Sequence, residues 1–181
     1  MKQGAPKQGP VAKRWPPSRR AILKWSLLVA SLAIALTVDL VTKQLADQRL
    51  VLGEVHRVLP FFYLERTANN GVAFGLLGGN TALIVVSNVI ALLVVLAYVA
   101  YERHPVLAGI AGGAVMGGSI GNMVERLTGD RLVTDFMKFP HWPNFNMADV
   151  FIDAGIAVIF LGLVVELILV WRHSRPRRSS S

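Results

Sequence analysis

Two aspartates near the last apolar segment of the sequence could carry out acid–base chemistry. Asp135 stands in a strand-like segment, residues 133–136, and Asp149 stands at the start of an apolar run, residues 148–171. Two prolines and an asparagine between residues 140 and 144 could fold the chain back and let the two carboxylates meet. Such a pair shares a proton, so that one acid can act as a base and the other as an acid on water. Spacing alone leaves open that Asp135 is a solvated loop residue and Asp149 a helix N-terminal charge.

Three further acids lie within or beside apolar segments, where an ionisable group is costly and therefore a functional candidate. Asp39 precedes Lys43 by one helical turn, so the two can pair, and a purely structural role is as well supported as a catalytic one. Asp153 follows Asp149 by four residues, on the same helix face. Glu166 lies close to Arg172 and His173, which favours a paired structural role.

Several other reaction classes find no support in the sequence. There is no cysteine, which excludes a thiol nucleophile, a disulfide and cysteine-bound zinc. The four histidines are scattered and no H-E-x-x-H motif occurs, so a metallopeptidase is disfavoured. Ser119 has no histidine or lysine at a plausible helical spacing to serve as its base. We therefore predict a site with no metal and no organic cofactor.

The elements that must position these acids are membrane spans. The chain has 181 residues, 53% hydrophobic and 17% charged, and a positive mean hydropathy of +0.48. Four windows approach the roughly 20 apolar residues that cross a bilayer. They are residues 21–42, 81–101, 106–124 and 148–171. We expect an all-α membrane protein of four transmembrane helices, in which the first helix is retained rather than cleaved as a signal peptide.

The net charge of +8 is concentrated at the two ends of the sequence. Basic residues cluster at or before residue 24 and after residue 171, which marks both ends as cytosolic by the positive-inside rule and argues against nucleic-acid binding. We interpret residues 1–20 and 174–181 as disordered basic arms flanking a membrane domain, residues 21–173. Two connections, residues 43–80 and 125–147, then face the extracytoplasmic side.

The two extracytoplasmic connections contain short β-like segments. Residues 55–67 and 131–139 alternate in the manner of strands, and Asn69-Asn70-Gly71 is a turn signal. On the other side of the membrane, residues 102–104 form a tight turn before Pro105, which suits a helix start. The third span is rich in glycine, at spacings that include small-xxx-small, and this pattern is typical of close helix packing.

Five motifs occur in the order and topology of a known family. They are Asp39-Leu-Val-Thr-Lys43, Asn69-Asn-Gly-Val-Ala-Phe74, Gly121-Asn-Met-Val-Glu-Arg126, Val133-Thr-Asp-Phe136 and Phe145-Asn-Met-Ala-Asp149. On these motifs the chain, from about residue 22 to 171, resembles lipoprotein signal peptidase, also called signal peptidase II. Glu125 stands where the family usually has aspartate, and Thr134 stands where it usually has a second valine.

The resemblance implies an aspartic endopeptidase of the bacterial inner membrane with Asp135 and Asp149 as its catalytic residues. By the same resemblance, Asp39 and Lys43 would support the site, and five residues would line the substrate site: Asn69, Gly71, Asn122, Arg126 and Asn146. From their chemistry, Asn69 and Asn146 could hold an extended peptide or a tetrahedral oxygen, and Arg126 a carboxylate or a carbonyl, or else a lipid phosphate. The implied substrate is a diacylglyceryl-modified prolipoprotein, cut on the N-terminal side of its lipidated cysteine.

We expect this enzyme to act as a monomer whose other partners are membrane lipids. The main rival from another functional class is a small proton-coupled transporter or lipid-binding protein, whose acids would carry protons near the middle of the membrane. Here the candidate acids cluster at one face, which favours chemistry at the membrane surface.

Overall fold

The computed structural model describes residues 18–71, 80–128 and 132–174. Among these residues four helices are long and apolar enough to cross a membrane, which confirms the four predicted spans. They are α1 (Arg19–Arg49), α2 (Thr81–Tyr101), α3 (Pro105–Thr128) and α4 (Met147–Ser174). Helix α1 starts inside the predicted N-terminal arm and continues seven residues past the predicted span. Helix α4 ends one residue inside the predicted C-terminal arm, and residues 1–17 and 175–181 of the two predicted arms lie outside the described residues.

The helices begin where the sequence supplies groups that satisfy their free backbone N–H groups. The side chain of Ser18 accepts a hydrogen bond from Ala21 N at the start of α1, and Asn80 accepts one from Leu83 N at the start of α2. Helix α3 begins at Pro105, as predicted, directly after the turn at residues 102–104. The amine of Lys24 donates to two carbonyls at the end of α2, those of Ala100 and Glu102.

Helix α3 is the central helix of the bundle and packs against the other three. In its apolar window 61% of the residues are buried, against 17% or less for the other helices. The predicted glycine packing surface is confirmed, because Gly109 and Gly117 face the backbone of α1. A Cβ atom at either position would lie 2.6 Å from a carbonyl oxygen, that of Lys24 or of Leu32. Only glycine permits this approach of the two backbones.

Three strands form one antiparallel sheet, which confirms the predicted β-rich connections. The strands are β1 (Val55–Leu59), β2 (Phe62–Asn69) and β3 (Val133–Lys138), in the order β1-β2-β3. Asp47, near the end of α1, joins the helix to the sheet because its carboxylate accepts hydrogen bonds from Arg66 of β2 and Thr134 of β3. Arg131, which we placed in the third strand, lies outside the described residues.

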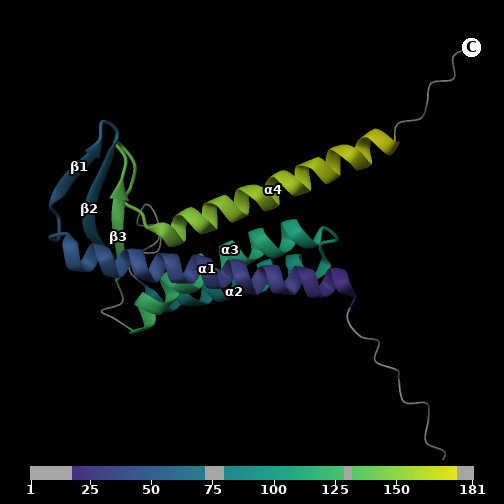
Figure 1. Cartoon of the computed structure of the whole chain (residues 1–181), viewed down its shortest axis with the longest axis horizontal. Helices are drawn as coiled ribbons and strands as arrows, with labels where there is room; N and C mark the ends of the chain where they lie inside the picture. Colours follow the sequence, from purple (N-terminus) through teal and green to yellow (C-terminus); the bar gives the residue numbers. More distant parts are fainter. Residues whose placement is uncertain (1–17, 72–79, 129–131, 175–181) are drawn as a thin grey trace, which may run out of the picture.

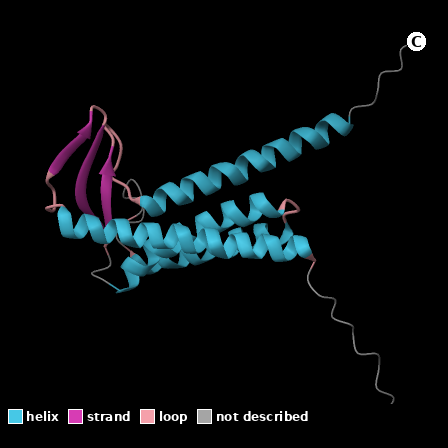
Figure 2. Ribbon diagram, in the orientation of Figure 1, coloured by secondary structure: helices cyan, strands magenta, loops and turns pink. Residues whose placement is uncertain are grey.

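The sheet lies at one end of the helix bundle, and the start of α1 and the end of α4 both lie at the opposite end (Figure 1). Figure 2 shows the three strands gathered beside the end of α1 and the beginning of α4. Two spans, α2 and α3, separate the two connections that carry the strands. Both connections therefore lie on the same side of the bundle. This arrangement brings β3 next to the start of α4.

Candidate active site

Asp135 and Asp149 line one cavity of about 810 Å³ at the sheet end of the bundle. Asp135 is in β3 and is only 2% exposed, and Asp149 is in the first turn of α4. The cavity wall combines β2 and β3 with one face each of α2, α3 and α4. The structure thus brings together the two aspartates that the sequence singled out.

A tight turn returns the chain from β3 to the start of α4. Trp142 N donates to the carbonyl of Phe139, and between them Pro140 precedes His141, whose φ is +61°. A proline followed by a residue of positive φ is the arrangement of a type II turn. Beyond the turn, Phe145 pairs with Met137 of β3 through two backbone hydrogen bonds of 2.9 and 3.0 Å. Asn146 follows directly and therefore lies beside Asp135.

Asn146 connects the two aspartates. Its side-chain amide donates to Asp135 Oδ1 at 2.7 Å, and its backbone N–H donates to Asp149 Oδ2 at 3.1 Å. Its side-chain oxygen accepts a hydrogen bond from Asp149 N, so Asn146 and Asp149 form a reciprocal capping box at the start of α4. Within the described residues no hydrogen bond joins the two carboxylates directly. The geometry of the pair is set by the residue between them, which is fully buried.

Two further asparagines each hold one aspartate. Asn69, at the end of β2, donates to Asp135 Oδ2 at 2.9 Å and accepts a hydrogen bond from Gly71 N. Asn122 of α3 donates to Asp149 Oδ1 at 2.9 Å. The sequence suggested that Asn69 and Asn146 hold the peptide or a tetrahedral oxygen. In the structure the side-chain amides of both are bonded to Asp135, although both also line the cavity.

The surroundings of Asp135 favour its protonated form. Burial raises the pKa of Asp135 to about 7, and the nearby charge of Asp149 also raises it, whereas the hydrogen bonds from Asn69 and Asn146 act in the opposite direction. Asp149 differs in its surroundings, because it accepts two hydrogen bonds at the positive end of the α4 dipole. A buried acid with a raised pKa close to a second acid that accepts hydrogen bonds is an arrangement that can activate water.

A buried ion-pair network contacts the residues around Asp149. Lys43 Nζ lies 2.8 Å from Asp39 Oδ2 and 3.0 Å from Glu125 Oε2, and it donates to Asn122 Oδ1 at 2.8 Å. Asp39 in turn accepts a hydrogen bond from Ala148 N, in the first turn of α4. Asp39 and Lys43 therefore pair as their spacing predicted, and they contact the residues that hold Asp149 rather than Asp149 itself.

Arg126 fixes the chain segment that follows β2. Its Nη2 donates to the carbonyl of Gly71 at 3.1 Å, which is one of the two ligand types that the sequence suggested for it. Arg126 is 9% exposed and lines the cavity, and its Nε has no hydrogen-bond partner among the described residues. Residues 72–74, the end of the motif that begins at Asn69, lie outside the described residues.

Sequence reasoning missed two residues that hold the site together. Glu125 pairs with Lys43 and accepts a hydrogen bond from Thr134 N, next to Asp135. Asn144 donates to Glu65 and Thr67 of β2, and so ties the connection before α4 to the sheet. For Glu125 the available signal was its position in a recognised motif, one residue before Arg126. Asn144 carried only a turn signal.

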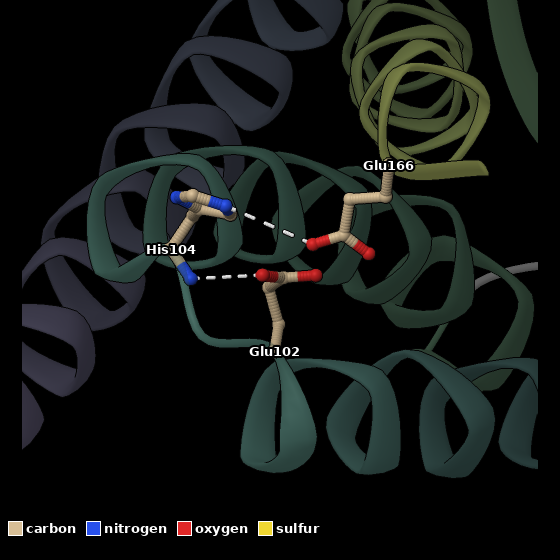
Figure 3. Close-up of side chains that lie close together, drawn as sticks. All are labelled: Glu102, His104 and Glu166. Carbon is tan, nitrogen blue, oxygen red and sulfur yellow. Dashed lines mark hydrogen bonds and ion pairs between the residues drawn. The ribbon is translucent and has the colours of Figure 1, made fainter. Parts of the chain in front are cut away.

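A second cluster of titratable groups lies at the turn between the end of α2 and the start of α3, at the end of the bundle opposite to the sheet. Figure 3 shows its three side chains close together. Glu102 accepts a hydrogen bond from His104 N, and His104 Nε2 lies 3.7 Å from Glu166 Oε1. The sequence placed Glu166 with Arg172 and His173. The structure instead pairs Glu166 with His104, because α4 approaches the turn between α2 and α3 there. The cluster joins that turn to α4 and takes no part in the aspartate site.

Comparisons with known proteins agree with the family resemblance. A family model described as signal peptidase (SPase) II matches residues 31–165. The lipoprotein signal peptidase of Symbiobacterium thermophilum is 39% identical over 140 residues, which cover 73% of this chain and 90% of that protein. The lipoprotein signal peptidase of Aquifex aeolicus is 35% identical over 149 residues, covering 76% and 86%.

The fold is also that of a known membrane enzyme. A solved structure of a bacterial membrane enzyme superposes with a TM-score of 0.73 at 22% sequence identity, covering 78% of this chain and 90% of the other. A second one superposes with a TM-score of 0.69 at 23% identity. At these identities the likeness establishes the four-helix fold and its sheet.

Proposed function

Because this chain belongs to the signal peptidase II family and is therefore an aspartic peptidase that cleaves the signal peptides of lipoproteins, we propose that Asp135 and Asp149 are its catalytic residues. One observation carries the proposal. The two acids line the same cavity and are joined through a single buried residue, Asn146. Three asparagine amides position the two carboxylates from three different elements.

The proposed reaction uses one acid as a base and the other as an acid. The carboxylate of Asp149 takes a proton from water, whose oxygen attacks the carbonyl carbon of the scissile bond, while protonated Asp135 gives its proton to the carbonyl oxygen. The resulting diol collapses as its C–N bond breaks. Asp149 then passes its proton to the leaving nitrogen, and Asp135 regains a proton from a diol hydroxyl. The pair ends in its starting protonation state, with one peptide bond hydrolysed.

The remaining motif residues hold the site and the substrate. We propose that Asp39 and Lys43 orient the residues behind Asp149, as their contacts with Ala148 and Asn122 support. Arg126 contributes substrate binding through its Nε, which has no partner in the described part of the chain. Asn69, Gly71, Asn122 and Asn146 also line the cavity in which the substrate lies, and the asparagines keep both carboxylates in place.

The substrate is a diacylglyceryl-modified prolipoprotein, and the cut falls on the N-terminal side of its lipidated cysteine. The enzyme lies in the bacterial cytoplasmic membrane with both termini cytosolic and the aspartates at the extracytoplasmic face, as the basic residues at the chain ends favour. It acts as a monomer, and lipids surround the exposed apolar faces of its helices. Its peptidase domain is residues 21–173, and the basic arms flank it.

Cleavage of matched precursors by the purified protein tests this function. One precursor carries the diacylglyceryl cysteine, the second carries serine in its place, and each reaction is run with and without a metal chelator. We expect only the lipidated precursor to be cut, with the lipidated cysteine as the new N-terminus in the mass spectrum. Cleavage at another bond, equal cleavage of both precursors, or loss of activity with the chelator would contradict the proposal.

A further inference from the structure

One face of α2 lines the cavity below the aspartates. The lining residues Ile84, Ser87, Asn88 and Ala91 follow the helical spacing of three and four residues. Asn88 stands seven residues after the start of α2, about 10 Å along the helix axis at 1.5 Å per residue. The aspartates lie at the sheet end of the bundle, where α2 begins. Asn88 therefore belongs to the part of the cavity within the membrane, below the site of hydrolysis.

The side chain of Asn88 offers an acceptor that the described residues leave unused. Its Oδ1 is buried and has no hydrogen-bond partner among them, and neither Asp135 nor Asp149 contacts it. Inside a membrane an unpaired amide oxygen is unfavourable, since no bulk water is available to satisfy it. Four other asparagines that line the cavity form side-chain hydrogen bonds with the protein, namely Asn69, Asn122, Asn144 and Asn146. Because Oδ1 has almost no exposed surface, the amide of Asn88 must turn toward the cavity to accept from a donor that enters it.

The bound substrate would supply such a donor. A peptide bond inside a helix cannot present its carbonyl carbon to a catalytic pair, so the signal peptide must unwind next to the cut. Unwinding releases backbone N–H groups that need acceptors in the membrane. An extended chain advances about 3.3 Å per residue, so the roughly 10 Å from the start of α2 to Asn88 corresponds to about three residues, counted from a scissile bond at the level of that start. The inference rests on the proposed function, because the proposed orientation in the membrane decides that the signal peptide extends from the scissile bond toward Asn88.

We propose that Asn88 binds the unwound end of the signal peptide by accepting a hydrogen bond from a backbone N–H about three residues before the scissile bond. The carbonyl oxygen of Asn88 is the acceptor, and the apolar neighbours Ile84 and Ala91 contact the side chains of the peptide. Because every residue except proline has this N–H, Asn88 reads the extended backbone rather than a side chain. Asn88 is a specificity-determining residue for unwound, apolar signal peptides and takes no part in proton transfer.

Ester substitution in a synthetic lipidated precursor tests this contact. An ester in place of one amide removes a single backbone N–H, and it is introduced two, three or four residues before the scissile bond. For the wild-type protein we expect the ester at one of these positions to raise KM about tenfold with little change in kcat. Asn88→Leu, which is similar in volume, should raise KM for the all-amide precursor by a similar factor.

The combination of the two changes is decisive. If Asn88 accepts from that N–H, Asn88→Leu cleaves the ester precursor and the all-amide precursor with equal KM. Val89→Leu, which lies on the exposed face of α2, should behave as wild type. If Asn88→Leu does not fold, Asn88→Ala replaces it in the same comparison. An unchanged KM in the Asn88 variant, or ester effects that add fully to it, would overturn the inference, whereas a wild-type protein that cuts no lipidated precursor would contradict the proposed function instead.

Discussion

The two aspartates at the sheet end of the bundle have unlike surroundings, and this difference predicts which one holds the proton. Asp135 is buried in β3, and its pKa is raised to about 7, first by burial and then by the charge of Asp149. Asp149 accepts hydrogen bonds from Asn122 and from the backbone of Asn146. Below about pH 7 the pair therefore holds one proton, shared in favour of Asp135.

The pH dependence of cleavage follows from this raised pKa. As the pH rises through about 7, Asp135 loses its proton, so the acid of the reaction is lost and the rate falls. We expect kcat/KM to decrease about tenfold per pH unit on the alkaline side, with an apparent pKa near 7 that belongs to the pair. A rate that stays constant from pH 6 to pH 9 would be incompatible with this assignment.

Lys43 is the cation that forms ion pairs with two acids next to the site, Asp39 and Glu125. Substitution Lys43→Met leaves Asp39 and Glu125 without their partner, so we expect it to lower the free energy of unfolding by about 3–5 kcal/mol. Thermal unfolding in detergent measures the change. Lys138→Met is the matched control, because the ion pair of Lys138 with Glu65 is partly exposed and contributes less. Equal unfolding temperatures for the two variants would show that the buried network does not stabilise the fold.

At the scale of the elements, glycine determines how closely α1 and α3 pack. A Cβ at Gly117 would lie 2.6 Å from the carbonyl oxygen of Leu32, and neither backbone can move without opening the interface. We expect Gly117→Ala to destabilise the protein by about 1–3 kcal/mol. Gly162→Ala is the control, because its Cβ would meet only the end of the Leu107 side chain, which can rotate away. Thermal unfolding of both variants measures the difference, and equal stability would contradict the packing argument.

The sequence predicted the elements better than their contacts. Hydropathy located all four spans because a membrane-crossing helix needs a long apolar run, and strand-like alternation located the three strands. The pairing of Asp39 with Lys43 followed from their spacing of one helical turn. The hydrogen bond from Ala148 N to Asp39 could not be predicted, because it joins residues 109 positions apart in the sequence.

The site was predicted only in part, because its contacts also join residues that are far apart in the sequence. Asp135 and Asp149 could be chosen because a turn between them allowed a meeting, and the five motifs supported the choice. No local pattern showed that the amide of Asn146 would lie between them, since this depends on the pairing of Phe145 with β3. Asn88 was not singled out either, because one polar residue in an apolar span has no periodic signal. Its unpaired buried oxygen is visible only in three dimensions.

At the scale of the whole molecule, the proposed orientation places the sheet and both aspartates outside the cytoplasm. The chain contains no cysteine, so single cysteines can be introduced as unambiguous labels. We expect Glu54→Cys, beside the sheet, to react with a membrane-impermeant maleimide in intact spheroplasts. Arg103→Cys, in the turn between α2 and α3, should react only after the membrane is opened. The reverse labelling pattern would place the active site in the cytoplasm.

The central proposal is that the fold holds two catalytic carboxylates in one cavity, so the most direct test is to remove one acid at a time. The measurement is the cleavage rate of a lipidated precursor by Asp135→Asn, by Asp149→Asn and by Glu54→Gln, an exposed acid outside the cavity. We predict that each aspartate variant loses activity by a factor on the order of 1,000 or more while Glu54→Gln keeps the wild-type rate. A rate within about tenfold of wild type in either aspartate variant would contradict the proposal that these two residues activate water together.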